Sequence, residues 1–373
     1  MTRHEVVIVG AGPAGLGAAA RLRAAGVDAL VIDRSETVGS SWRTRYDSFR
    51  LHTIRWLSAL PGMRIPASTG SWVGRDDFIS YLEAYADRFD IAPRLGVDVR
   101  SLAASGDGWT LSTSDGSLDA RRIVFATGAC ARPRLPRWPG AESFGPPLIH
   151  SSEYRSPAGY RGRTVLVVGS GNSATEVATD LASSGDVRVQ LAVRTPPTIL
   201  RRDTAGLPTQ PIGIALRYAP AAVVDPLGAA MRRLTIADLA GFGLPAPSKP
   251  YSQFQASGTV PVLDHGFVAA VRSGAITVRP GVTALAGDDV VHADGTRSTP
   301  DAVIAATGYT PGLEPILGGP GLLDPRGLPT FGSRGGSGDS AGLYSVGIAI
   351  LLSGLLREIG KDANRLVHAI TEA

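Results

Sequence analysis

The chain has 373 residues, of which 43% are hydrophobic and 19% charged, a composition that is ordinary for a globular enzyme and long enough for two domains. Its net charge of +4 comes with no Lys/Arg run and no basic–aromatic interleaving, which argues against a nucleic-acid partner. The single cysteine, Cys130, excludes an internal disulfide and a dithiol relay. We expect a cytoplasmic protein without a signal peptide, because the first strand starts at once and the longest apolar run (346–356) is too short to span a bilayer.

The chain opens with a strand–turn–helix–strand unit of the kind that builds parallel sheets. A β-branched run (5–9) precedes Gly10-Ala11-Gly12-Pro13-Ala14-Gly15, and an Ala/Leu/Arg-rich helix to Ala25 follows. A second apolar strand, Ala29–Ile32, ends at Asp33. The order of these elements predicts a dinucleotide-binding turn.

Each glycine of this turn has a physical task. Gly10 permits the tight turn, Gly12 lets the backbone approach a pyrophosphate, and Gly15 lets the helix pack closely on the strand. The helix N-terminus offers unpaired N–H groups and partial positive charge to the phosphates. Asp33 can accept hydrogen bonds from a ribose 2′-hydroxyl and would repel a 2′-phosphate, so this site is predicted to take FAD or NAD rather than NADP.

The same order of elements recurs in the middle of the chain. A strand (163–168) runs into Gly169-Ser170-Gly171-Asn172-Ser173-Ala174, and a helix to about Ser183 and a strand (187–193) follow. This strand ends in Arg194-Thr195, and the planar guanidinium of an arginine suits a 2′-phosphate, which predicts NADPH. A solvated surface arginine is the alternative. Asn172 has two readings that stay open, a contact with the nicotinamide side or a helix cap.

Two further strand-like runs, 122–125 and Ala302–Ala305, each end in Ala-Thr-Gly. The simplest topology inserts the second nucleotide-binding domain into the first. We therefore predict an α/β fold with two Rossmann-like dinucleotide-binding domains. Residues 1–150 and 298–373 would form the FAD-binding domain, and residues 151–297 the inserted NADPH-binding domain. Segment 40–77 lacks periodicity and is expected to wrap over the bound cofactor.

Beyond these units, the sequence resembles the flavin-containing monooxygenase family, and most of all its YUCCA-type branch, over nearly the whole chain. The family identity motif F-x-G-x-x-x-H-x-x-x-Y maps onto Phe144, His150 and Tyr154, with Pro146 in place of the glycine. Thr53 stands where many amine-oxidising members carry asparagine, and Gly312 where the YUCCA pattern expects one. Other matching segments are Val38-Gly39-Ser40-Ser41-Trp42, residues 46–53, residues 78–86, residues 259–264, Ala306-Thr307-Gly308-Tyr309 and Gly354-Leu355-Leu356.

The two glycine-rich turns, which we call the dinucleotide-binding fingerprints, and the matching segments together predict the cofactor sites. The predicted FAD residues are Gly10, Gly12, Pro13, Ala14, Gly15, Asp33, Arg34, Ser41, Trp42, His52, Thr127, Gly128, Gly347, Gly354 and Leu355. The predicted NADPH residues are Gly169, Gly171, Asn172, Ser173, Ala174, Arg194, Thr195, Thr307 and Gly308. His52, Tyr46 and Thr53 are candidates to line the substrate pocket, with a packed structural role as the alternative for His52 and Tyr46. No metal site is predicted, since the histidines lack ligand spacing.

The resemblance also implies a mechanism. NADPH reduces FAD, the reduced flavin traps O₂ as a 4a-(hydro)peroxyflavin, and NADP⁺ stays bound to shield it. Such an enzyme needs a dry pocket rather than an acid–base pair, so its catalytic residues stay unknown. The substrate is a small organic molecule, either a nitrogen or sulfur nucleophile or an α-keto acid of the indole-pyruvate type.

Other readings of the two fingerprints stay open. One is an NADPH-dependent flavin reductase or oxidase that passes electrons to a partner or to O₂ without oxygen insertion. A non-catalytic nucleotide-sensing module is another, against which the retention of both fingerprints argues. The sequence predicts no membrane contact and leaves the oligomeric state open, with a homodimer as one alternative.

Overall fold

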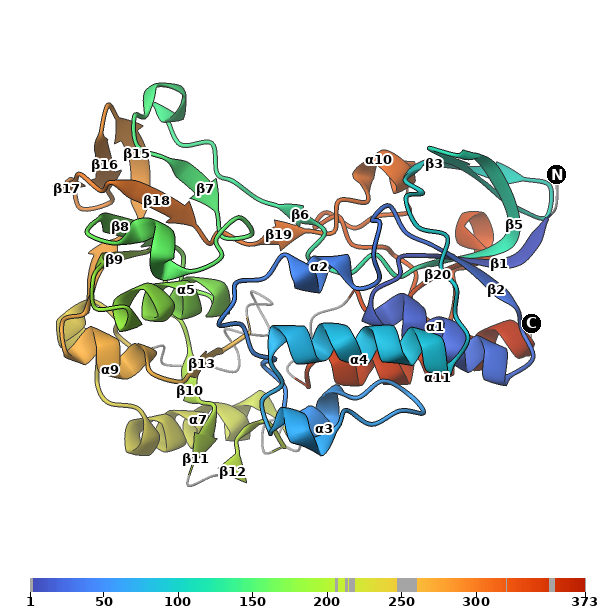
Figure 1. Ribbon diagram of the computed structural model, residues 1–373, viewed down its shortest axis with the longest axis horizontal. Coiled ribbons are helices and arrows are strands. Elements are labelled where there is room, and N and C mark those ends of the chain that lie inside the picture. Colours follow the sequence, from blue (N-terminus) through green and yellow to red (C-terminus); the bar gives the residue numbers. More distant parts are fainter. Residues whose placement is uncertain are drawn as a thin grey trace. The chain divides into compact units, whose positions relative to one another are not determined.

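The computed structural model describes residues 3–204, 207–211, 214, 219–246, 260–319, 321–348 and 353–372 (Figure 1). The chain folds into two compact units. The first unit comprises Met1–Thr44, Arg50–Arg132 and Tyr309–Ala373, and the second comprises Arg45–Phe49 and Pro133–Gly308. Each unit has its own parallel sheet and its own core cluster.

The first unit is built on a six-stranded sheet in the order β2-β1-β5-β4-β3, with β20 also paired to β5. Strands β1, β2, β5 and β20 run parallel, whereas β3, β4 and β5 form an antiparallel meander. Their bounds are β1 (His4–Val9), β2 (Ala29–Ile32), β3 (Val99–Ser105), β4 (Gly108–Thr113), β5 (Gly116–Phe125) and β20 (Leu343–Ser345). Residues 6–9 of β1 are buried on both faces, which is why this strand is a continuous apolar run.

Helix α1 (Pro13–Ala24) packs against β1 and β2, and helices α4 (Arg75–Arg88) and α11 (Leu355–Thr371) pack against α1 (Figure 1). Helix α1 begins with Pro13, whose fixed φ and missing N–H suit the first position of a helix. A core cluster joins the parallel strands to the meander and to the short helix α10 (Glu314–Leu317), through residues that include Val7, Ile32, Phe125, Leu111 and Leu317.

Segment 40–77, in which the sequence shows no periodicity, holds only short elements. They are α2 (Ser40–Arg43), α3 (Arg55–Ser58), the 3₁₀ turn η1 (Ala67–Thr69) and the start of α4. Within this segment, Arg45–Phe49 belongs to the second unit. We call these five residues the strap.

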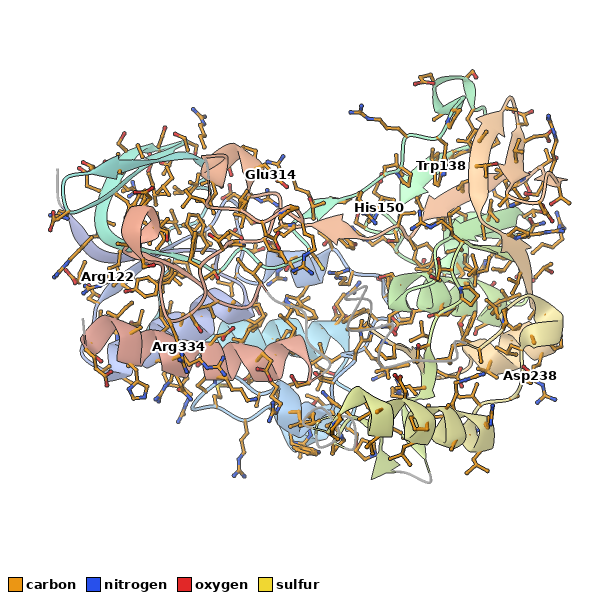
Figure 2. The ribbon with its side chains drawn as sticks, turned by 180° about the vertical axis from the view of Figure 1, so that it is seen from behind. Arg122, Trp138, His150, Asp238, Glu314 and Arg334 are labelled. Carbon is orange, nitrogen blue, oxygen red and sulfur yellow. The ribbon has the colours of Figure 1, made fainter. Side chains whose placement is uncertain are left out.

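The second unit carries a five-stranded parallel sheet in the order β14-β9-β8-β18-β7. The strands are β7 (Leu148–His150), β8 (Thr164–Val168), β9 (Arg188–Val193), β14 (Ile276–Pro280) and β18 (Ala302–Ala305). Helices α5 (Asn172–Ser183) and α9 (Phe267–Arg272) pack against it, and a small sheet of β15 (Val282–Ala286), β16 (Asp289–His292) and β17 (Arg297–Ser298) completes the unit. Leu166, Val303, Leu285 and Trp138 meet in its core, and Trp138 is labelled in Figure 2.

Among the described residues, the remaining elements of the second unit are short, except for one helix. They are β10 (Ile199–Arg201), β11 (Asp203–Thr204), β12 (Leu207–Pro208), α7 (Ala221–Thr235), β13 (Val262–Asp264) and the 3₁₀ turns η2 (Ala141–Ser143), η3 (Pro157–Tyr160) and η4 (Ala240–Phe242). In the described part of the chain, no helix combines the length and the apolar character needed to cross a membrane.

The predicted α/β fold with two Rossmann-like units is confirmed, but the domain ends lie elsewhere. The chain passes between the units at residues 132–133 and 308–309, whereas the sequence analysis placed these ends at 150–151 and 297–298. The reason is strand pairing: β18 lies between β8 and β7 in the second sheet. Residues 133–150 and 298–308 therefore belong to the second unit, together with the strap.

Candidate functional site

The turn after β1 lies at the carboxyl end of the first parallel sheet. Gly10 has a φ of +117°, and a Cβ there would lie 2.6 Å from the carbonyl oxygen of Ala126. A Cβ at Gly15 would clash with the Gly10 carbonyl, so this glycine allows α1 to approach β1. Gly12 differs, because its φ of −85° suits any residue and a Cβ there would meet nothing within 4 Å. The open space over Gly12, beside the unpaired N–H groups of α1, fits a pyrophosphate.

Asp33 follows β2 at the same edge of the sheet. Its Oδ2 accepts a hydrogen bond from Ala11 N at 2.6 Å, and its Oδ1 accepts one from Ser35 N at 2.8 Å. These bonds fix the carboxylate, and each oxygen keeps a lone pair for a ribose hydroxyl. The neighbouring Arg34 donates through Nη2 to the carbonyl oxygen of Ala131 at 3.2 Å.

Thr127 and Gly128 follow β5, the strand next to β1. Thr127 Oγ1 is buried and has no hydrogen-bond partner within the described ranges. A buried hydroxyl without a partner costs about 1–3 kcal/mol, so a polar ligand group at this edge would relieve it. A Cβ at Gly128 would meet nothing within 4 Å. Backbone N–H groups, a carboxylate and a free hydroxyl along one edge fit the pyrophosphate and ribose of FAD.

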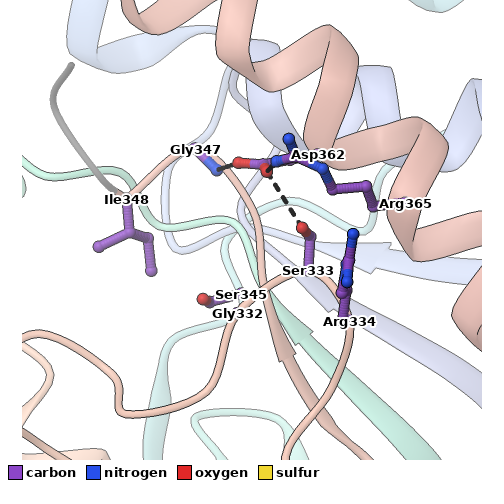
Figure 3. Close-up of a pocket in the computed structure, with 8 residues that line it drawn as sticks. All are labelled: Gly332, Ser333, Arg334, Ser345, Gly347, Ile348, Asp362 and Arg365. Carbon is purple, nitrogen blue, oxygen red and sulfur yellow. Dashed lines mark hydrogen bonds and ion pairs between the residues drawn. The ribbon is translucent and has the colours of Figure 1, made fainter. Parts of the chain in front are cut away.

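Gly347 follows β20 and lies against α1. A Cβ at this position would be 2.7 Å from the Cβ of Ala14, and its φ is +68°. Gly347 N donates to Oδ2 of Asp362 at 3.5 Å, and the other oxygen of Asp362 accepts from Ser333 Oγ at 3.0 Å (Figure 3). A cavity of about 400 Å³ opens beside them, with Arg334 and Arg365 among its lining residues.

The start of α11 is held by a buried carboxylate. Gly354 caps the helix with a φ of +93°, and Leu355 is its first residue. Glu358, 4% exposed, accepts hydrogen bonds from Ser353 Oγ at 2.6 Å, Arg357 Nη1 at 2.8 Å and Lys361 Nζ at 3.0 Å. Residues 349–352 of the link from Gly347 lie outside the described residues.

Ser41 and Trp42 lie on α2. The residue before this helix, Gly39, has the left-handed backbone conformation. The ring of Trp42 packs edge-on against Phe78 of α4, with the centroids 4.6 Å apart. Ser41 is exposed.

The three pocket candidates belong to different units. His52 and Thr53 belong to the first unit and Tyr46 to the second. Thr53 Oγ1 shares a hydrogen bond with Ser58 Oγ in α3. Tyr46 is 4% exposed and its hydroxyl bonds to the carboxylate of Glu176 on α5. Tyr46 is thus packed and hydrogen-bonded and anchors the strap to α5, while its place in the substrate pocket stays a prediction.

The second fingerprint divides its tasks in the same way as the first. A Cβ at Gly169, whose φ is +142°, would clash with the carbonyl oxygen of Ala306. Ala174 stands in the place of the third glycine and is fully buried. Gly171 precedes α5, and a Cβ there would meet nothing within 4 Å. Ser173 lies half-buried in the first turn of α5.

Asn172 takes a role that neither reading of the sequence included. Its Nδ2 donates to the carbonyl oxygen of Pro261 at 3.1 Å, and its Oδ1 accepts from Leu263 N at 2.9 Å. The helix-cap reading is wrong, because the capping position is Gly171 and no side chain caps α5. Asn172 instead clamps β13 to the start of α5, and its contact with the nicotinamide side stays a prediction.

Arg194 and Thr195 follow β9 and are exposed. Among the described residues, no hydrogen bond or ion pair engages the Arg194 guanidinium. An unengaged guanidinium at the strand end next to Gly171 fits the 2′-phosphate of NADPH.

Thr307 and Gly308 follow β18 and are fixed by two side chains. Arg134 Nη2 donates to the Thr307 carbonyl oxygen at 3.1 Å, and Thr307 Oγ1 donates to the Arg134 carbonyl oxygen at 2.6 Å. The ring of His150, which is labelled in Figure 2, places its Nε2 3.0 Å from the Gly308 carbonyl oxygen. Ser152 N donates to His150 Nδ1 at 3.1 Å, so the ring proton resides on Nε2. Burial lowers the pKa of His150 and keeps it neutral.

The identity motif is therefore a folding motif of the second unit. Phe144 packs in the core of that unit and His150 holds the turn after β18. Tyr154 donates to Asp180 of α5 at 2.7 Å, and burial, followed by the Asp180 contact, raises the pKa of Tyr154. The sequence analysis did not find Arg134, Ser152 or Asp180, since no local pattern indicates their partners.

Comparison with known proteins agrees with this geometry. The family model for pyridine nucleotide-disulphide oxidoreductases matches residues 7–205. The chain is 37% identical over 348 residues to the indole-3-pyruvate monooxygenase YUCCA1 of Oryza sativa subsp. japonica, covering 91% of this chain and 86% of that protein. It is 33% identical over 351 residues to the probable indole-3-pyruvate monooxygenase YUCCA1 of Arabidopsis thaliana, with 92% and 84% covered.

A solved flavin monooxygenase from Stenotrophomonas maltophilia, in a mutant form, matches with a TM-score of 0.78 at 23% identity, covering 100% of this chain and 99% of that chain. This likeness shows the shared fold. The two-domain architecture, the residues at the carboxyl ends of the two parallel sheets and the sequence relatives all indicate the same family. The chain belongs to the YUCCA-type flavin-containing monooxygenases, oxidoreductases that use FAD and NADPH.

Proposed function

We propose that this enzyme oxygenates an α-keto acid of the indole-pyruvate type, with NADPH as the hydride donor and O₂ as the oxygen source. The observation that carries the proposal is the identity of 37% across 91% of the chain to a protein named an indole-3-pyruvate monooxygenase. The two cofactor-binding edges of the structure support it, because each keeps the open glycine and the strand-end side chain that its cofactor needs.

The reaction balances as an oxidative decarboxylation. One oxygen atom of O₂ enters the keto acid beside its carbonyl carbon, the carboxylate leaves as CO₂, and the other oxygen atom becomes water. NADPH and one proton supply the two reducing equivalents, and the products are the shortened acid and NADP⁺. FAD, when bound, accepts the hydride and activates O₂.

The residues of this chain supply binding and positioning. We propose that Gly12, Asp33 and Thr127 hold the pyrophosphate and ribose of FAD in the first unit. Gly347 and the pinned start of α11 (Gly354 and Leu355) would support the flavin end. Gly171 and Arg194 would hold NADPH in the second unit, with the turn of Thr307 and Gly308 beside it. A cleft that excludes water, rather than an acid–base pair, would protect the reactive oxygen species from protons.

Product analysis tests the proposed reaction. The FAD-loaded enzyme, supplied with NADPH, O₂ and indole-3-pyruvate, is expected to form indole-3-acetate and CO₂ in one-to-one ratio to NADPH consumed. A tertiary amine and a thioether serve as competing substrate classes. Hydrogen peroxide equal to the NADPH consumed, with no oxygenated product from any of the three, would contradict the proposal and favour the flavin oxidase alternative.

We also propose that the enzyme works in the cytoplasm, where NADPH is kept reduced and a lone cysteine such as Cys130 suits the reducing conditions. Cell fractionation with NADPH-dependent activity as the readout tests this. A homodimer stays a prediction, which light scattering of the FAD-loaded protein checks.

A further inference from the structure

The strand order of the second sheet gives a bound dinucleotide a direction. Arg194 follows β9, Gly171 follows the neighbouring β8, the Thr307–Gly308 turn follows β18, and Ser151 follows the outermost β7. These strands run parallel, so their carboxyl ends form one edge, where α/β sheets bind ligands. With strands about 4.8 Å apart, the path from β9 to β7 is about 14 Å long, the scale of an extended dinucleotide.

Each strand end along this edge suits one part of NADPH. The guanidinium at β9 suits the 2′-phosphate, and the helix N-terminus after β8 suits the pyrophosphate. What remains of the molecule, the nicotinamide riboside, would then lie over the ends of β18 and β7. Ser151 is the first residue beyond β7, and its backbone N donates to Ala305 at the end of β18 at 3.0 Å.

Ser151 itself is an anomaly at this edge. The residue is 4% exposed, and its Oγ is buried without a hydrogen-bond partner within the described parts of the chain. The groups around it are engaged: Ser152 Oγ lies 2.9 Å from His150 Nδ1, and Glu153 Oε1 accepts from His150 N at 3.0 Å. The turn after β7 therefore holds an unpaired buried hydroxyl at the edge where the nicotinamide riboside is expected.

We propose that Ser151 Oγ hydrogen-bonds the nicotinamide riboside half of NADPH and so positions the hydride donor. The inference rests on the proposed placement of NADPH in the second unit. The hydroxyl can donate to a carboxamide or ribose oxygen and can accept from the carboxamide NH₂ or a ribose hydroxyl. Either bond would satisfy a group that the protein alone leaves unpaired.

The test compares a whole dinucleotide with its adenosine half. Calorimetric titration of the FAD-loaded S151A variant with NADP⁺ should give a Kd about 5- to 10-fold above that of the wild type, the loss of one hydrogen bond. Adenosine 2′,5′-bisphosphate lacks the nicotinamide riboside, so S151A should bind it as the wild type does. The melting temperature of nucleotide-free S151A should be unchanged or higher, since an unpaired buried hydroxyl has been removed.

Ser298 offers a matched control in the same unit. It is 7% exposed and its Oγ lies 2.8 Å from His292 Nε2, so S298A should lower the melting temperature and leave the Kd of NADP⁺ unchanged. R194A should weaken both ligands, because both carry the 2′-phosphate.

The outcomes separate the inference from the placement on which it rests. An unchanged NADP⁺ Kd in S151A overturns the inference alone, since the hydroxyl then adds nothing to cofactor binding. Equal weakening of both ligands, or a lowered melting temperature as in S298A, assigns Ser151 a structural role and also overturns it. If R194A binds both ligands like the wild type, the placement of NADPH and the inference fail together.

Discussion

Two strand-end side chains of opposite charge distinguish the two units at the scale of single residues. Asp33 is held by hydrogen bonds from Ala11 N and Ser35 N, whereas Arg194 is exposed and unengaged among the described residues. A side chain that the fold uses affects stability when it is replaced, while an exposed side chain affects only what it binds. Arg194 is therefore the cleaner probe of cofactor choice.

Replacing Arg194 by alanine should change cofactor preference without changing stability. The loss of a charge-assisted contact with the 2′-phosphate, worth about 1.5–3 kcal/mol, predicts a KM for NADPH raised about 10- to 100-fold. The KM for NADH and the melting temperature should stay near their wild-type values. Steady-state kinetics with both cofactors measures this, and an equal change for NADPH and NADH would contradict the role of Arg194.

His150 predicts a pH dependence of stability. Burial lowers the pKa of His150 below its ordinary value of 6.5, so between the two values the unfolded chain binds more protons than the folded one. The contribution of His150 to stability is therefore present above pH 6.5 and is lost as the pH falls through the lower, folded-state pKa.

The H150Q variant checks this dependence, because its amide can still donate to Gly308 but does not titrate. Melting temperatures measured from pH 7.5 to 5 should show the wild type losing more stability on acidification than H150Q. Parallel curves for the two proteins would refute the assignment.

At the scale of elements, each βαβ turn uses one glycine for folding and another for its ligand. Gly10 and Gly169 have positive φ values and no room for a Cβ, while Gly12 and Gly171 have ordinary φ values and open space. The first pair is required by the close approach of the residue that follows the neighbouring strand, Ala126 after β5 or Ala306 after β18. The second pair is required only by a phosphate that comes close to the backbone.

The G10A and G12A variants should separate these two tasks. G10A should destabilise the first unit by several kcal/mol, because its Cβ would meet the Ala126 carbonyl and its φ is strained. G12A should melt like the wild-type apoprotein yet bind FAD at least about 10-fold more weakly, since its Cβ would occupy phosphate space. Flavin content and apoprotein melting temperature are the two measurements, and a G12A variant with full flavin content would argue against a pyrophosphate there.

At the scale of the whole molecule, each unit has a core cluster of its own. One core joins β1, β2 and β5 to the meander, and the other joins β8 and β18 to the small β15–β17 sheet. The strap, anchored by Tyr46 to Glu176, belongs to the second unit although its sequence neighbours belong to the first. Separate cores favour separate unfolding transitions.

Calorimetry of the flavin-free enzyme should therefore resolve two transitions. FAD should raise only one of them, and adenosine 2′,5′-bisphosphate only the other. A ligand at 100 times its Kd stabilises its unit by about 2.7 kcal/mol. The R194A variant is the control, because it should lose the shift caused by the bisphosphate. One transition that responds to both ligands would show that the units unfold together.

The sequence by itself determined the two βαβ units, their turns and the strand-end residues Asp33 and Arg194. Helix and strand periods, glycine spacing and a charge at a strand end are written in contiguous residues, so local physics is enough to predict them. The predicted strands at Ala29–Ile32 and Ala302–Ala305 lie where they were expected. The helix-cap reading of Asn172 failed because its partners, Pro261 and Leu263, lie far along the chain.

Only the tertiary structure decided which distant segments meet. Parallel pairing places β18 between β8 and β7, and this moved both domain ends away from their predicted positions. The same pairing brings His150 to Gly308, 158 residues away, and leaves the hydroxyl of Ser151 buried and unpaired. Such contacts depend on which strands share hydrogen-bond ladders and cores, a choice made by the packing of the whole unit and carried by no local pattern.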